Sequence, residues 1–194
     1  MLKRLFDITV SLFFLCTLFP FLYIIIGMAV KATSPGPVLF KQQRHGKDGC
    51  VFTCLKFRTM KINDEADTLQ ATGNDKRLTS IGGFLRKTSL DELPQFINVL
   101  KGDMSIVGPR PHMLRHTEMY SVLIPGYMRR LAVKPGITGL SQVLGYRGET
   151  PAVADMARRV RLDLWYISHR SFRLDMWVFL RTFSTFLSLK TNHK

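Results

Sequence analysis

The chain has 194 residues, a length that fits one domain with its own hydrophobic core. Its 28 Lys and Arg outnumber 14 Asp and Glu, which indicates polyanionic partners such as nucleic acid, an anionic membrane surface or phosphorylated substrates. A hydrophobic fraction of 46% is too high to be accounted for by a nucleic-acid-binding module alone. Three cysteines do not make a disulfide scaffold, and they favour a reducing, cytoplasmic setting.

The N-terminal segment is apolar. Residues 8–30 carry no charge, and a bilayer span takes about 20 apolar residues. Pro20 lies near the middle of this run, where its missing N–H is expected to break a helix. Lys3 precedes the run and Lys31 follows it, so the positive-inside rule assigns both ends to the cytoplasm. Two alternatives follow from the residues: a kinked transmembrane span, or a re-entrant helix-break-helix that returns to the side it entered.

The elements that follow are short. The turn SPGPV, residues 34–38, ends the apolar segment. Residues 38–57 predict a β-hairpin, because two apolar-rich runs flank the turn residues HGKDG. The polar stretch 61–79 is expected to be a surface loop with a short helix. A helix is predicted over 92–101, where apolar residues recur at helical spacing and Gly102 follows as the C-cap.

Two helices are predicted in the C-terminal part. The first covers 150–167, with Thr150 as N-cap and Pro151 at the first helical position. The second covers 171–190, where Phe and Trp mix with basic residues. That mixture suits an interfacial helix on anionic lipid and a core helix equally well.

The acids Asp91 and Glu92 are adjacent within the basic stretch RKTSLDELPQF. A purely structural interpretation is a capping box, with Ser89 as N-cap and Glu92 reaching back to it. Pro94 is tolerated only in a first helical turn, so Asp91 is itself a candidate N-cap. Free N–H groups at such a terminus attract phosphate. An ionised carboxylate beside a phosphate can coordinate Mg²⁺ or attack phosphorus to form an acyl phosphate.

Basic residues that can hold a phosphorylated substrate occur in three places. Arg86 lies just upstream of the acids. Arg110 stands between two prolines, so its backbone is largely fixed before a substrate arrives. Lys56 and Arg58 alternate along the second predicted strand and are expected to share a face. Each alone fits a solvated basic surface, whereas together with the apolar segment they favour phosphoryl transfer at a bilayer surface.

Six blocks of the sequence resemble one known family. In chain order these are KRLFDI, SPGPVLFKQQRHG, KFRTM, LRKTSLDELPQFINVLKGDMSIVGPRP, VKPGITGLSQV and RLDLWYI. They resemble the monotopic phosphoglycosyl transferases, or bacterial sugar transferases, over nearly the whole chain. The resemblance implies a mixed fold, mainly α with a small β-hairpin. It implies a re-entrant membrane helix hairpin at 1–33 and a catalytic domain with interfacial helices at 34–194. It also implies location at the bacterial inner membrane, with the active site on the cytoplasmic face.

The resemblance further implies a reaction. Such enzymes move a sugar 1-phosphate from a UDP-sugar to undecaprenyl phosphate, the first membrane step of exopolysaccharide, capsule or O-antigen synthesis. Asp91 is then the expected nucleophile, forming a phosphosugar-aspartyl intermediate, with Glu92 as its partner and Mg²⁺ near Asp91. The block GYRGET, residues 145–150, resembles members that transfer glucose or galactose phosphate, which favours UDP-glucose or UDP-galactose.

Further residues are assigned by the same resemblance. Arg86 and Arg110 match family arginines near the phosphate site. Gln142 and Arg147 are candidates for contact with the nucleotide or sugar. Members often carry Ser-Pro at the helix break, whereas this chain has Phe19-Pro20, and a phenylalanine cannot satisfy a backbone group freed by proline. A homodimer is left open.

Other interpretations of the sequence compete with this one. They are a membrane-tethered, non-catalytic protein that binds lipid or glycan, a hydrolase that forms an aspartyl phosphate, and a nucleic-acid binder. No nucleic-acid partner is expected, because the aromatic residues concentrate in the apolar terminal segments. His112 and His116, like His45 with Cys50 and Cys54, have metal-ligand spacing, but packing or surface residues and buried strand residues are the preferred interpretations.

Overall fold

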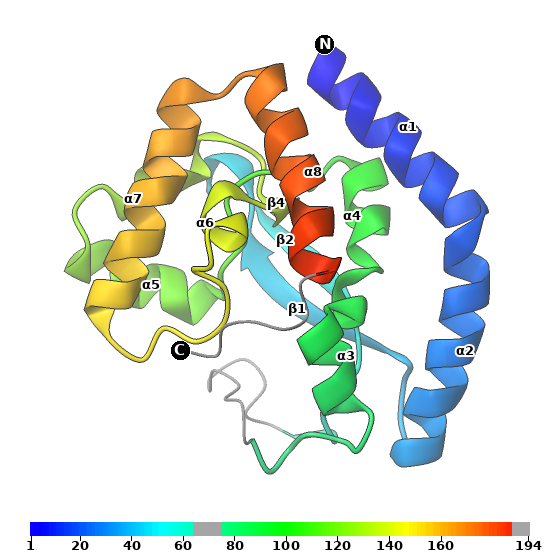
Figure 1. Ribbon diagram of the computed structural model, residues 1–194. Coiled ribbons are helices and arrows are strands. Elements are labelled where there is room, and N and C mark those ends of the chain that lie inside the picture. Colours follow the sequence, from blue (N-terminus) through cyan, green and yellow to red (C-terminus); the bar gives the residue numbers. More distant parts are fainter. Residues whose placement is uncertain (64–74, 188–194) are drawn as a thin grey trace.

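The computed structural model describes residues 1–63 and 75–187. The described part is mainly helical with two small sheets, as Figure 1 shows. In chain order the elements are α1 (Leu2–Cys16), α2 (Leu18–Thr33), β1 (Leu39–His45), η1 (Lys47–Gly49), β2 (Val51–Phe57), α3 (Gly82–Thr88), η2 (Leu90–Glu92), α4 (Gln95–Lys101), β3 (Ser105–Val107), α5 (Leu114–Leu123), η3 (Tyr127–Ala132), β4 (Gly136–Thr138), α6 (Leu140–Val143), α7 (Val153–His169) and α8 (Phe172–Leu187). The η elements are short 3₁₀ turns. The mainly α class with a small β-hairpin is therefore confirmed.

Strands β1 and β2 form the predicted antiparallel hairpin. Leu39 lies opposite Phe57 at the open end, and His45 lies opposite Val51 at the turn. Burial along β2 alternates except at the neighbours Cys54 and Leu55, which are both buried, and Cys54 lies in the core as the strand interpretation predicts. Cys50 precedes the strand and is exposed, so the prediction of burial is wrong for that residue.

The second sheet is not predicted by the sequence. It pairs β3 with β4 in parallel, with Ser105 opposite Gly136 and Val107 opposite Thr138. Where the two strands meet, a Cβ on Gly136 would lie 2.1 Å from the backbone nitrogen of Gly108. Both positions therefore require glycine for this close approach. After this close approach at Gly108, the chain continues from β3 into Pro109 and the residues that follow it.

The break in the N-terminal segment falls at Thr17, between α1 and α2, which are bent by 56°. Pro20 lies in the first turn of α2, where proline is tolerated, and it has no N–H for the carbonyl of Cys16, so α1 ends there. The Thr17 hydroxyl donates to the carbonyl of Phe13 at 2.7 Å. Among the described residues no single helix is long and apolar enough to cross a membrane, although α1 and α2 together pass that test.

Helices α1 and α2 lie along one edge of the molecule, with α1 beside α4 (Figure 1). Arg4 donates to the carbonyls of Val99 and Leu100, at 2.6 and 3.0 Å, at the end of α4. Asp7 is buried and accepts hydrogen bonds from Ser105 Oγ and the Ile106 N–H of β3. The outward side of both helices carries large exposed apolar side chains: Leu2, Leu5, Ile8, Leu12, Phe13, Leu18, Phe21, Ile24, Ile25 and Met28.

The predicted helix starts near the acids are wrong. Ser89 adopts a left-handed backbone conformation, with φ of 59°, and its side chain caps neither neighbouring turn, so there is no capping box. The residue ends α3 and turns the chain into η2, so α4 begins at Gln95 and Asp91 is not its N-cap. Gly102, with φ of 94°, is the C-cap as predicted.

The C-terminal helices differ from their predictions in detail. Helix α7 begins at Val153, because Thr150 and Pro151 belong to the preceding loop. Helix α8 buries Val178 while exposing Trp177 and Leu180, so one side packs against the core and the other is left open. The predicted polar loop at 61–79 lies partly outside the described residues.

Candidate active site

A side-chain cross-link between α4 and β2 positions the two acids. The Oδ1 of Asn98 accepts from the Leu55 N–H at 3.0 Å, and its Nδ2 donates to the carbonyl of Thr53 at 2.7 Å. Because η2 directly precedes α4, this cross-link holds η2 against the end of β2. Asp91 and Glu92 are consequently 7% and 6% exposed, and they lie beside Lys56.

Glu92 is surrounded by cations. Its Oε1 lies 2.7 Å from Lys56 Nζ and 2.6 Å from Arg110 Nη2, and its Oε2 accepts from Arg110 Nη1 at 3.1 Å. Arg147 Nη2 lies 4.0 Å from the same Oε2. Burial alone would raise the pKa of Glu92, but the charges of Arg110 and Lys56 outweigh it and hold that pKa well below its usual range. Glu92 is therefore ionised at neutral pH and anchors these cations.

Asp91 has a different environment. Within the described part of the chain no side chain donates a hydrogen bond to its carboxylate, and the ion pair it makes there is a long one, 3.9 Å to Lys56 Nζ. Burial, with the charge of Glu92 adding to it, raises the pKa of Asp91 against the opposing charges of Lys56 and Arg110. A partly desolvated carboxylate with uncommitted oxygens is suited to attack an electrophile.

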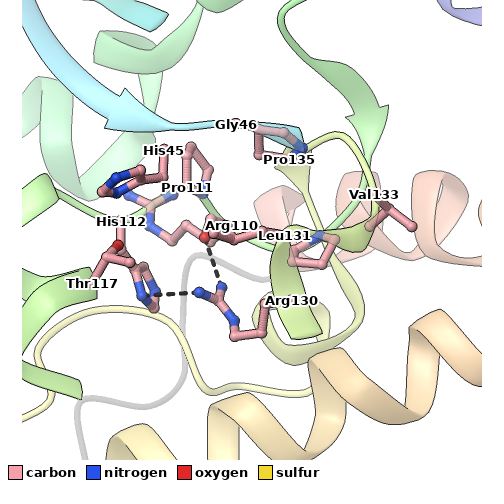
Figure 2. Close-up of a pocket in the computed structure, with 11 residues that line it drawn as sticks. His45, Gly46, Arg110, Pro111, His112, Thr117, Arg130, Leu131, Val133 and Pro135 are labelled. Atoms are coloured by element: carbon pink, nitrogen blue, oxygen red, sulfur yellow. Dashed lines mark hydrogen bonds between the residues drawn. The ribbon is translucent and has the colours of Figure 1, made fainter. Parts of the chain in front are cut away.

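The main chain around Arg110 is fixed on both sides, as the two flanking prolines predict. The carbonyl of Arg110 accepts from Arg130 Nη2 at 2.8 Å, a contact that Figure 2 shows. The carbonyl of Pro111 accepts from Arg44 Nη1 at 2.5 Å, and that of Pro109 accepts from the Gly136 N–H at 3.0 Å. The guanidinium of Arg110 is thereby presented to Glu92 from a rigid backbone.

Behind Arg110 lies a buried ion pair that the sequence analysis missed. Arg130 Nε donates to Asp163 Oδ2 at 2.8 Å, and Asp163 Oδ1 accepts from Ser141 Oγ at 2.9 Å. Arg130 Nη1 lies 3.1 Å from Nδ1 of His112, as Figure 2 shows. Burial and the charge of Arg130 lower the pKa of His112 well below its usual range, so its imidazole is a neutral packing group.

The signal that could have revealed Asp163 is its position in the sequence. It follows Met156 and Val160 at helical spacing, so it is a carboxylate on the buried stripe of α7. An acid on such a stripe needs a buried cation. Arg130 supplies that cation from η3.

Three other predicted site residues are placed as follows. Arg86, in the last turn of α3, acts on Asp91 by its charge, and its buried Nη1 has no hydrogen-bond partner among the described residues. Arg58 does not join the cluster. Its Nε and Nη2 donate to the carbonyls of Pro37 and Ser34, at 2.6 and 2.9 Å, because β2 ends at Phe57 and the alternation stops there. Gln142 donates to the carbonyl of Ile137 at 3.3 Å, and no described contact joins it to the acids.

The predicted magnesium site requires ligand side chains close to Asp91. Within residues 1–63 and 75–187 there is no group of three His, Cys, Asp or Glu side chains that could hold a metal ion. Both oxygens of Glu92 are committed to cations, which leaves Asp91 as the available carboxylate. One carboxylate fits the way Mg²⁺ is usually bound with phosphorylated substrates, where phosphate oxygens and water complete the shell.

Comparison with known proteins agrees with a site for phosphorylated substrates. The sequence profile described as bacterial sugar transferase matches residues 1–189. This chain belongs to the bacterial sugar transferase family. The predicted resemblance is thereby confirmed.

Several curated proteins are similar to this family member. UDP-glucose:undecaprenyl-phosphate glucose-1-phosphate transferase of Escherichia coli (strain K12) is 53% identical over 191 residues, which cover 97% of this chain and 41% of that protein. The protein of the same name from Klebsiella pneumoniae is 52% identical over 96% of this chain and 40% of its own length. The exopolysaccharide production protein PSS of Rhizobium leguminosarum bv. phaseoli is 45% identical over 93% of this chain and 92% of its own. The chain thus spans about two-fifths of the first two relatives.

Proposed function

We propose that this chain transfers a hexose 1-phosphate, glucose 1-phosphate in the first instance, from a UDP-sugar to undecaprenyl phosphate. The observation that carries the proposal is the unequal environment of the two acids. Glu92 is neutralised by Lys56 and Arg110, whereas Asp91 accepts no side-chain hydrogen bond among the described residues. The names of the similar proteins support glucose as the sugar and undecaprenyl phosphate as the acceptor.

In the first proposed step, an Oδ of Asp91 attacks the sugar-bearing phosphorus of the donor. A P–O bond forms to Asp91, and the P–O bond to the nucleotide breaks. UMP leaves with the electron pair, and a phosphosugar-aspartyl intermediate remains. The half-buried cations around Asp91, chiefly Lys56, Arg110 and Arg86, offset the negative charge that develops on the phosphate oxygens.

In the second proposed step, an oxygen of undecaprenyl phosphate attacks the same phosphorus. The bond to Asp91 breaks, the carboxylate is regenerated, and undecaprenyl diphosphate-hexose is released. Glu92 stays ionised throughout and keeps Lys56 and Arg110 in position. Glu92 is thus a positioning residue in this scheme rather than an acid or base.

Magnesium is part of this proposal. Asp91 would hold the ion together with diphosphate oxygens of the donor, and the ion would supply charge neutralisation at those oxygens. Chelation with EDTA is expected to abolish turnover, and added Mg²⁺ is expected to restore it. Turnover that continues unchanged in EDTA would remove Mg²⁺ from the proposal.

We further propose that α1 and α2 insert into the cytoplasmic face of the bacterial inner membrane as a re-entrant pair. Their outward apolar side chains form a continuous row of the kind that meets lipid. Basic residues at both ends of the pair, Lys3 and Lys31, favour return to the cytoplasmic side. A cysteine introduced next to each end should react with a membrane-impermeant thiol reagent from the same side, and labelling from opposite sides would contradict the re-entrant form.

The first experiment omits the acceptor. Protein in nanodiscs is incubated with UDP-glucose and Mg²⁺, and intact mass is measured for a phosphohexose adduct. An adduct on the wild type that is absent from Asp91→Asn is expected. No adduct, together with no UMP release when undecaprenyl phosphate is added, would overturn the proposal in favour of a membrane-tethered binding protein. UMP release without acceptor, with free hexose phosphate, would indicate a hydrolase.

A further inference from the structure

Arg159 is a buried cation that the proposed mechanism does not use. It lies on α7 and is only 4% exposed, while its neighbour Arg158 is exposed. Its Nη2 donates to the carbonyl of Gly148 at 3.0 Å. Its Nε is buried and has no hydrogen-bond partner in the described part of the chain. None of the ion pairs between described residues involves Arg159.

The charges around Arg159 compensate its own charge only in part. The charges of Arg110 and Arg130 repel it, and Asp163, the carboxylate whose charge acts favourably on it, is already paired with Arg130 and Ser141. Burial, followed by the charge of Arg110, lowers the pKa of Arg159 to about 10. Burying a charge without a partner costs free energy, and a bound anion would recover it.

The position of Arg159 relative to Asp91 indicates which anion it would meet. The side chain of Arg110 contacts Glu92, which is next to Asp91, and the carbonyl of Arg110 accepts from Arg130. Arg130 in turn pairs with Asp163, which lies one turn along α7 from Arg159. Along this chain of contacts from the acids, Arg159 lies beyond Arg110. In a diphosphate donor whose sugar-bearing phosphorus is at Asp91, the group one step further along is the phosphate of the departing nucleotide.

The loop joining α6 to α7 supports the same placement. Arg147 on this loop contacts Ser89 Oγ and approaches Glu92, and Gly148 follows it and is held by Arg159. Helix α7 lies on the opposite side of the molecule from α1 and α2 (Figure 1). A phosphate arriving there fits a water-soluble nucleotide better than the phosphate of a lipid held by the apolar helices.

We propose that Arg159 is a substrate-binding residue that contacts the phosphate of the nucleoside-monophosphate half of the donor, an assignment that rests on the proposed function. When the P–O bond to the nucleotide breaks, negative charge develops on that phosphate. Arg159 then stabilises the leaving group from the side opposite Asp91.

The test separates the phosphate from the nucleoside. Binding of UMP and of uridine to the detergent-solubilised full chain is measured by saturation-transfer difference NMR, which detects weak ligands. Arg159→Gln is expected to weaken UMP binding by about tenfold, the loss of one charged hydrogen-bonding contact, and to leave uridine binding unchanged. The matched control, Arg158→Gln, is expected to bind both ligands like the wild type.

Other results would overturn the assignment. Equal weakening of UMP and uridine would make Arg159 a positioning residue that acts through Gly148. If Arg159→Gln left UMP binding unchanged, the contact with the nucleotide phosphate would be contradicted. The same conclusion would follow if this variant bound geranyl phosphate more weakly while UMP binding was unaffected. A wild type that binds neither UMP nor UDP-glucose would instead overturn the proposed function.

A second variant covers misfolding of Arg159→Gln. Arg159→Lys keeps the charge but loses the planar donors. We expect this variant to bind UMP more weakly than the wild type and uridine equally well. Wild-type binding of both ligands, or equal weakening of both, would contradict the proposal.

Discussion

Two clusters of buried acids with their cations lie close together in this protein, and they differ in how completely their charges are paired. In the first, Asp163 uses one oxygen for Arg130 and the other for Ser141, and the two charged side chains are 1% and 3% exposed. In the second, Glu92 is shared by Lys56 and Arg110, while the closest ion-pair partner of Asp91 among the described residues is Lys56 Nζ at 3.9 Å. The Arg130–Asp163 pair fixes the main chain of Arg110. The cluster around Asp91 and Glu92 leaves one carboxylate, that of Asp91, available for reaction. The same residue types thus stabilise the structure in one place and, in the proposed mechanism, carry the chemistry in the other.

The largest expected effect comes from removing the uncommitted acid. Asp91→Asn should lower turnover with UDP-glucose and undecaprenyl phosphate by on the order of 10⁴-fold, as loss of a nucleophile does. It should not lower stability, because burial raises the pKa of Asp91 and the ionised form is disfavoured in the folded protein. UMP release and thermal unfolding measure the two effects. Turnover within tenfold of the wild type would contradict the nucleophile assignment.

Breaking the Arg130–Asp163 pair should instead lower the free energy of unfolding. Asp163→Ala leaves Arg130 buried without its acid, a change that typically costs about 3–5 kcal/mol. Urea unfolding monitored by circular dichroism gives the free energy. The single variants Arg130→Met and Asp163→Leu each leave one charge buried without its partner, so the double variant Arg130→Met/Asp163→Leu should lose less stability than either of them. Equal losses in all three would show that packing volume matters more than charge.

Glu92→Gln should have an intermediate effect on stability that depends on pH. The pKa of Glu92 is lowered in the folded protein, so its ionised form contributes stability above its unfolded pKa of about 4.3. That contribution is lost as pH falls through the folded pKa. At pH 7 the variant should be less stable than the wild type by about 1.5–3 kcal/mol, and the difference should shrink in acid. A difference that stays constant with pH would contradict the role of charge.

The smallest expected effect is a shift in the pH profile of turnover. Asp91 must be ionised to attack, so its raised pKa moves the acid limb of kcat/KM to higher pH than an ordinary aspartate would give. The charge of Glu92 contributes to that rise, so Glu92→Gln should move the limb to lower pH. Lys56→Met should move it to higher pH. Shifts in the reverse directions would assign the limb to another group.

Local pattern was sufficient for some of these features. Alternation and the turn residues predicted the β1–β2 hairpin, and Gly102 predicted the end of α4. The adjacent acids in a basic stretch, and Arg110 between its two prolines, are short sequence patterns, so they predicted the candidate site without any long-range information. The resemblance to a family then assigned Asp91 its role.

Contacts between distant residues were beyond the reach of local pattern. Arg130 meets Asp163 across 33 residues, and Asn98 meets Thr53 across 45, and no short stretch encodes either pairing. The start of α4 was misplaced because the left-handed conformation of Ser89 has no signature in residue type. Arg58 was misassigned to the cluster because a strand's alternation does not reveal where the strand stops.

The attachment of α1 also has a consequence for the order of assembly. Asp7 finds its partners Ser105 and Ile106 across 98 and 99 residues, and Arg4 finds its acceptors across 95 and 96. During synthesis, an apolar helix therefore emerges long before the polar groups that will hold it exist. Contacts between residues so far apart in the sequence form slowly, and an apolar segment that is exposed during this time is prone to aggregation. Under the proposed membrane insertion, capture of α1 by a lipid surface before the rest of the domain has folded would remove that hazard.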